Sequence, residues 1–223
     1  MKILALDTSS DACSVALWTD DALLERYETG NQHSGRILSL VQVVLAESGH
    51  ALTQLDAIAF SRGPGSFTGL RIGAGVTQGL AFGADLPVLP VSSLAALAQG
   101  VAADKVLAAF DARMNQLYWG AYARNARGFV ELCGEENVLG PTQLPMPEGT
   151  GWIGAGNGWD QYAAELAAHF GHRVSGWREQ CFPHARFVAQ LGIHLYAAGG
   201  ALPPEQALPV YLRDDVAKKQ NSF

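Results

Sequence analysis

Short apolar runs separated by turn residues divide the first hundred residues into alternating strands and helices. The pattern predicts strands at 2–7, 13–18 and 22–28, a helix at 34–48, a strand at 56–61, a helix at 68–82, a strand at 86–91 and a helix at 92–99. The first three strands form an antiparallel meander, because only short polar turns connect them. The later alternation of helix and strand is typical of a mixed sheet covered by helices.

The opening plan of the chain recurs after residue 104. The pattern predicts strands at 105–111, 117–122 and 129–138, a proline-rich connector at 141–147, a strand at 151–156 and helices at 158–170 and 184–198. Each half begins with an apolar strand that ends in an aspartate, Asp7 or Asp111. We interpret this as an internal duplication. We predict an α/β fold with domains 1–102 and 103–223, in which the last ~18 residues pack back on the first half.

The predicted helix at 34–48 is apolar over more than one face. A surface helix needs an apolar stripe of about 100°. The polar positions here form only a narrow strip, and the apolar ones are 37, 38, 40, 41, 43, 44 and 45. One side of such a helix can face its own sheet, so the other side requires a second surface.

A glycine-rich stretch, Gly63–Gly83, is the most unusual part of the chain. Each helical glycine costs about 1 kcal/mol relative to alanine. The five helical glycines, 69, 73, 75, 79 and 83, fall in one sector of about 160°. Glycines on one side of a helix leave a groove there. Three explanations of this groove stay open: close packing against its own sheet, a phosphate at the helix N-terminus, or a partner helix in the groove.

Composition limits the functional classes. The net charge of −6 argues against a chain that binds nucleic acid by itself through a basic surface. The three cysteines form no CxxC pair and indicate reduced thiols in a cytoplasmic protein. The many glycines and the charged Arg71 within Gly63–Gly83 favour a water-soluble helix over a membrane-spanning one.

The motifs of common catalytic sites do not fit the chain. A phosphate loop of the Walker type ends in Gly-Lys-Ser/Thr, but Gly69 is followed by Leu70 and Arg71. The histidines lack metal-ligand spacing, and no nucleophile elbow occurs. Asp7 and Asp111 are either turn residues or a pair of carboxylates suited to magnesium-bound phosphate. We therefore expect no metal, no cofactor and no catalytic residue.

Six stretches along the chain carry a family pattern: MKILALDTSSDACSVAL, HSGRILSLV, FSRGPGSFTGLRIG, FDARMNQLYWGAY, GAGNGW and PVYLRDDVAKK. Together and in this order they resemble the TsaB (YeaZ) family of bacterial tRNA threonylcarbamoyladenosine biosynthesis proteins. The resemblance runs nearly from end to end. It implies an actin-like (ASKHA) fold of two ribonuclease-H-like mixed sheets flanked by helices, which agrees with the duplication.

The resemblance also implies a function. Members of the family are non-catalytic partners of TsaD, which works with the ATPase TsaE to transfer a threonylcarbamoyl group to the adenosine beside the anticodon. The partner helices correspond to 34–48 and 68–82, and the same surface can form a homodimer. The helix that carries His-x-x-x-His in TsaD begins here with His33 and lacks the second histidine. We expect the chain to reach tRNA only through this complex, in the cytoplasm and away from membranes.

Two sets of candidate residues follow from this resemblance. The partner-binding set is Arg36, Ile37, Leu40, Val41, Val44, Leu45, Gly69, Arg71, Gly73, Val76, Gly79 and Leu80. The set for a vestigial cleft between the halves is Asp7, Ser9, Asp111, Arg113, Gly154 and Gly156. The alternative function is a stand-alone ASKHA-type enzyme that uses ATP or a metal, with the cleft as its active site.

Overall fold

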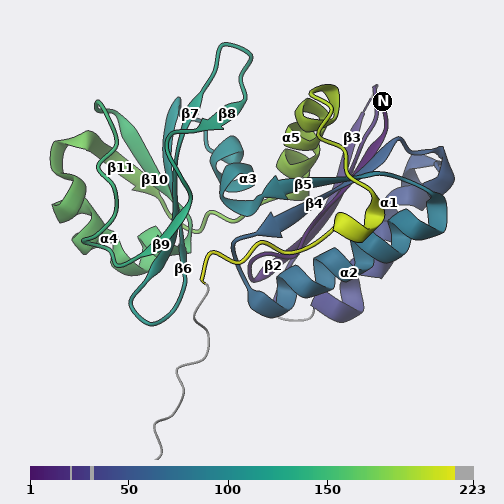
Figure 1. The fold of residues 1–223 in the computed structure, drawn as a ribbon, viewed down its shortest axis with the longest axis horizontal. Coiled ribbons are helices and arrows are strands. Elements are labelled where there is room, and N and C mark those ends of the chain that lie inside the picture. Colours follow the sequence, from purple (N-terminus) through teal and green to yellow (C-terminus); the bar gives the residue numbers. More distant parts are fainter. Residues whose placement is uncertain (21, 31–32, 214–223) are drawn as a thin grey trace, which may run out of the picture.

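The computed structural model describes residues 1–20, 22–30 and 33–213. Figure 1 shows two lobes side by side, each built on its own sheet. The end of the second predicted domain, residues 214–223, lies outside the described residues.

The first sheet has five strands in the order β3-β2-β1-β4-β5. The strands are β1 (Ile3–Asp7), β2 (Ala12–Trp18), β3 (Leu23–Thr29), β4 (Ala57–Gly63) and β5 (Val88–Ser92). β1, β2 and β3 pair antiparallel, as the meander predicts, whereas β4 and β5 run parallel to β1. All five residues of β1 are buried, because helices cover both faces of this central strand.

The second sheet repeats this plan. Its strands are β6 (Lys105–Asp111), β7 (Leu117–Arg124), β8 (Val130–Leu132), β9 (Asn137–Leu139), β10 (Trp152–Ala155) and β11 (Val174–Arg178). The order β8-β7-β6-β10-β11 and the strand directions match those of the first sheet. The predicted strand at 129–138 is in fact two short strands, β8 and β9. β11 was not predicted, because its half-exposed residues and Gly176 give no apolar run.

Five α-helices and three short 3-10 helices complete the described fold. They are α1 (His33–Ser48), η1 (Leu52–Gln54), α2 (Phe67–Ala84), α3 (Ser93–Gly100), α4 (Asn157–Phe170), η2 (Gly171–Arg173), α5 (Ala185–Ala197) and η3 (Pro204–Gln206). α1 and α2 cover one face of the first sheet. The second half has no described helix at the place of α1, where the proline-rich connector runs instead.

Packing divides the chain differently from the predicted domain boundary. The apolar face of α5 is buried against the first sheet, where Ala185 and Val188 lie among Ile3, Ala5 and Ala59. Conversely, Leu94, Leu97 and Ala98 of α3 pack on the second sheet. The segment after α5 also returns to the first half, where Leu202 pairs with Val88 in an antiparallel bridge. A continuous domain 103–223 is therefore wrong for α5, because the first sheet buries that helix.

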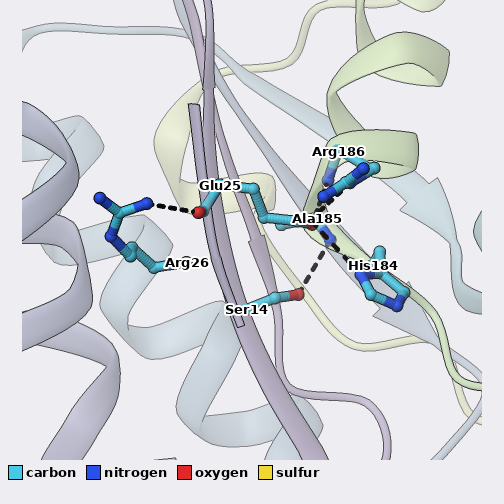
Figure 2. Close-up of polar contacts among 6 residues, drawn as sticks. All are labelled: Ser14, Glu25, Arg26, His184, Ala185 and Arg186. Carbon is cyan, nitrogen blue, oxygen red and sulfur yellow. Dashed lines mark hydrogen bonds and ion pairs between the residues drawn. The ribbon is translucent and has the colours of Figure 1, made fainter. Parts of the chain in front are cut away.

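The N-terminus of α5 is held by side chains of the first sheet. Glu25 on β3 accepts a hydrogen bond from the backbone N–H of Arg186 at 3.0 Å, and Ser14 on β2 accepts one from Ala185 at 2.9 Å. His184 and the Arg186 guanidinium also contact the Glu25 carboxylate (Figure 2). The His184 ring stacks on Tyr27 with 4.3 Å between centroids. These contacts fix the second half of the chain to the first sheet.

Glu25 is expected to make folding stability depend on pH. Burial opposes its charged form, but hydrogen bonds from His184 and Arg186 outweigh burial and lower the pKa of Glu25 below its usual 4.5. The stabilisation is therefore present above pH 4.5 and is lost as the pH falls through the lower pKa of the folded chain. We expect Glu25→Gln to reduce the free energy of unfolding at pH 7 by about 2 kcal/mol.

Urea unfolding at pH 7 and at about pH 3.5 measures this effect, with the matched variant Glu28→Gln as control. Glu28 forms an exposed ion pair with Arg36, which is expected to contribute less than about 1 kcal/mol. The loss from Glu25→Gln should shrink at the lower pH. An equal loss of unfolding free energy at both pH values would contradict the connection between the pKa of Glu25 and stability.

Candidate functional site

The glycines of α2 face two different environments. A Cβ on Gly69 would lie 2.0 Å from the carbonyl oxygen of Thr8, and one on Gly73 would lie 2.5 Å from the Thr8 hydroxyl. The same hydroxyl donates a 2.7 Å hydrogen bond to the carbonyl of Gly69. A Cβ on Gly75 or Gly79 would meet no atom within 4 Å. The interpretation of one continuous groove is therefore wrong.

The loop before α2 packs onto the turn between β1 and β2. The backbone N–H of Ser66 donates to the carbonyl of Ser9 at 2.7 Å. A Cβ on Gly65 would lie 2.2 Å from that same oxygen. Ser66 caps the helix by accepting a hydrogen bond from the N–H of Gly69. Of the three explanations for the glycines, close packing within the chain thus accounts for Gly65, Gly69 and Gly73.

Part of the predicted partner-binding set belongs to the chain's own core. The side chains of Ile37, Leu40, Val41 and Val44 are buried under the first sheet, so they offer no surface to a partner. Gly69 and Gly73 are likewise buried. The prediction is wrong for these six positions, because they lie on the inward faces of α1 and α2.

The outward sides of α1 and α2 carry exposed apolar side chains. Leu38 is 49% exposed and Phe82 is 61% exposed. The exposed charged residues of the two helices, Arg36, Glu47 and Arg71, lie outside this apolar group. α1 and α2 lie next to each other along the first lobe (Figure 1). We call this surface the helix face; its residues are Leu38, Gln42, Leu45, Gly75, Val76, Gly79, Leu80 and Phe82. It retains Leu45, Val76, Gly79 and Leu80 from the predicted set.

The two arginines of the predicted partner-binding set bind neighbouring segments of the chain. Arg36 pairs with Glu28 of β3. The Arg71 guanidinium lies 3.4 Å from the centroid of the Phe67 ring, and its Nε donates to the Tyr211 hydroxyl at 3.0 Å. Arg71 therefore fixes the C-terminal segment against α2 rather than pointing from the helix face.

A pocket of about 480 Å³ lies between the two halves. Ser9, Asp111 and Arg113 of the predicted cleft set line it. The pocket is also lined by residues outside the predicted cleft set: Ser10, Asp11, Gly65, Ser66, Phe67, Phe110, Ala112, Tyr118, Asn157, Tyr211 and Arg213. All of them fall within the stretches quoted above for the family resemblance, which were the available signal.

Asp7 lies beneath this pocket rather than in it. Its carboxylate accepts hydrogen bonds from the hydroxyls of Ser9 and Ser61 and from the N–H of Ser9. Burial raises the pKa of Asp7 above its usual value, and the hydrogen bonds from Ser61 and Ser9 oppose that shift. The side chain is 1% exposed, so it is not placed to face a ligand across the cleft.

The turn after Asp111 has an unusual backbone. Arg113, Met114 and Asn115 have φ values of 63°, 56° and 56°, in the left-handed region that side chains other than glycine disfavour. Asp111 supports the turn by accepting a 2.9 Å hydrogen bond from the Arg113 N–H, and its carboxylate lies 3.6 Å from the Arg113 guanidinium. Arg113 therefore projects at the pocket with its side chain 87% exposed.

The two glycines of the predicted cleft set serve packing. A Cβ on Gly154 would lie 2.3 Å from the Trp159 ring, and one on Gly156 would lie 2.2 Å from the carbonyl of Ala109. Neither glycine lines the pocket. Within the described residues, no group of three or more His, Cys, Asp and Glu side chains is arranged to hold a metal.

Comparison with known proteins identifies the family. A family model for TsaD, tRNA N6-adenosine threonylcarbamoyltransferase, matches residues 27–170. The tRNA threonylcarbamoyladenosine biosynthesis protein TsaB of Escherichia coli is 42% identical over 99% of this chain and 98% of its own. TsaB of Haemophilus influenzae is 38% identical over 99% and 97%.

A solved structure agrees with these relatives. YeaZ from Pseudomonas aeruginosa superposes with a TM-score of 0.88 at 45% identity, covering 95% of this chain and 99% of that one. The predicted actin-like fold is confirmed by this match and by the two mixed sheets. No helix in the described ranges combines the length and apolarity needed to cross a bilayer. The chain belongs to the TsaB (YeaZ) family and takes part in the biosynthesis of threonylcarbamoyladenosine in tRNA.

Proposed function

We propose that the chain is a non-catalytic subunit that pairs with TsaD through the helix face. The observation that carries this proposal is the helix face, whose eight residues are uncharged. Phe82 and Leu38 are exposed on it, and a Cβ on Gly75 or Gly79 would meet no atom within 4 Å. Small residues allow a second helix to approach closely, and apolar side chains lose water on contact.

The choice of TsaD as partner rests on shared architecture. The TsaD family model matches residues 27–170, a range that contains all of α1 and α2. The catalytic subunit therefore has a counterpart of both helices, and two like faces can pair about a two-fold axis. By the same reasoning the helix face forms a homodimer when TsaD is absent. TsaE joins the pair as the ATPase, and the assembly acts on tRNA in the cytoplasm.

The cleft supports the non-catalytic role. Asp7, the acid that ends β1, is buried beneath Ser9, and burial disfavours its charged form. A carboxylate that binds a magnesium-phosphate complex needs its charge and access to the ligand. The alternative, a stand-alone enzyme that uses ATP or a metal, draws only on the presence of a pocket between the halves.

Replacing Asp7 separates these two functions. We expect Asp7→Asn to leave the rate of tRNA modification by the reconstituted complex unchanged, because the carboxylate does not reach the pocket. The free energy of unfolding at pH 7 should be retained within about 1 kcal/mol or rise, since a buried charge is removed. If the purified chain hydrolyses ATP, and Asp7→Asn abolishes this activity, the chain is instead a stand-alone enzyme.

A further inference from the structure

The mouth of the pocket carries a cluster of arginines and aromatic rings that the proposed pairing with TsaD does not use. We define the cleft cluster as Phe67, Arg71, Arg113, Tyr211 and Arg213. Phe67 and Tyr211 are both exposed, and their ring centroids lie 5.6 Å apart. Arg113 and Arg213 line the pocket together with Asp11 and Asp111, and Arg71 adjoins it through its contacts with Phe67 and Tyr211.

The cluster is held in place by specific contacts. Arg71 stacks on Phe67 and hydrogen-bonds Tyr211, which fixes both rings at the pocket. The Nη2 of Arg213 donates to the side-chain oxygen of Gln116 at 2.6 Å. The backbone N–H of Val210 donates to the carbonyl of Arg62 at 2.8 Å, which anchors this segment to β4.

We propose that the cleft cluster binds an unpaired nucleotide of the RNA substrate. Exposed aromatic faces stack on bases, and arginine side chains bind phosphate oxygens. The pocket volume of about 480 Å³ falls within the range of small-ligand sites. Asp11 and Asp111 also line the pocket and repel phosphate, and Asp111 lies 3.6 Å from the Arg113 guanidinium. The phosphate is therefore assigned to the outer side of Arg113, which is 87% exposed, and to Arg213, and the base to Phe67 and Tyr211.

A free nucleotide fits this pocket less well than an RNA segment. Gly69 packs tightly against Thr8, and Gly65 packs tightly against Ser9, so the space beside the first turn of α2 is filled. The phosphates of a free nucleotide would need backbone N–H donors in that space. The side chain of Arg113 is 87% exposed, so a continuous strand can reach it from solvent. The inference rests on the proposed function, because it assigns the RNA to the tRNA of that complex.

Binding of fluorescein-labelled tRNA transcript tests this inference, measured by anisotropy with the full chain alone and with TsaD. We expect the double variant Arg113→Glu/Arg213→Glu to weaken binding at least tenfold and to make it less dependent on salt. Tyr211→Ala should weaken binding about tenfold, because a stacking surface is lost. The control is the double variant Arg127→Glu/Arg173→Glu, an equal charge change at two positions of the second half that do not line the pocket.

The outcomes separate this inference from the proposed function. Co-elution of the variants with TsaD shows that pairing is intact. If tRNA binding by the Arg113→Glu/Arg213→Glu variant then equals that of Arg127→Glu/Arg173→Glu, or if the chain binds no tRNA either alone or with TsaD, the inference is wrong and the pairing stands. Equal competition by AMP or ATP would show a free-nucleotide site and would overturn it. If the variants lose only the binding of TsaE and still bind tRNA, the inference is also wrong, because the cleft cluster then binds a protein.

Discussion

Replacing Gly69 with alanine is expected to prevent stable folding of the chain. The new methyl group would lie 2.0 Å from the carbonyl oxygen of Thr8, and a backbone atom cannot move aside as a flexible side chain can. β1 would have to shift relative to α2, although all of its residues are buried between helices. We expect a loss of about 4 kcal/mol or more, at the upper end of single-substitution effects.

The matched control is Gly75→Ala in the same helix. A Cβ at this position meets no atom within 4 Å, and alanine favours helix over glycine by about 1 kcal/mol. We therefore expect Gly75→Ala to raise the free energy of unfolding by that amount. Urea unfolding followed by circular dichroism measures both variants. Equal effects of the two substitutions would show that Gly69 is not packed against Thr8 as described.

The second large effect concerns pairing with TsaD. We expect Phe82→Glu to weaken the affinity for TsaD at least a hundredfold, because it replaces the most exposed apolar side chain of the helix face with a charge. Gly79→Leu should have a similar effect, since its side chain would fill the space for the partner helix. Both positions are exposed, so the isolated chain should stay folded.

The control for pairing is Leu132→Glu on β8. Leu132 is an exposed apolar residue, 42% exposed, but it lies on the second lobe (Figure 1). Titration of labelled TsaD with each variant, followed by fluorescence, gives the affinities. A loss at Leu132→Glu that equals the loss at Phe82→Glu would point to a different interface.

Much of the fold could be predicted because apolar periodicity follows the sheet and the helices closely. The bounds predicted for α1 and β6 agree within one residue with the structure. The strand at 129–138 could not be divided from sequence, since the break at Gly134 depends on pairing of β8 and β9 with different parts of β7. The packing of α5 on the first sheet is a long-range contact that local patterns do not encode.

The candidate sites were harder to predict, and the glycines of α2 show why. Spacing placed all five on one sector of the helix, but that sector spans both the inward and the outward surface. Gly69 and Gly73 face Thr8, whereas Gly75 and Gly79 face outward. Ile37 and Val44 were assigned to a partner because α1 has apolar residues on several faces, and only packing shows which side is the core. Tyr211 and Arg213 reach the pocket through folding of distant segments.

Hydrogen exchange of the chain with and without TsaD, followed by mass spectrometry, tests the central claim most directly. The account predicts that TsaD slows amide exchange in α1 and α2 and leaves α4 on the second lobe unchanged. Unchanged exchange in α1 and α2, with protection confined to the second lobe, would contradict pairing through the helix face.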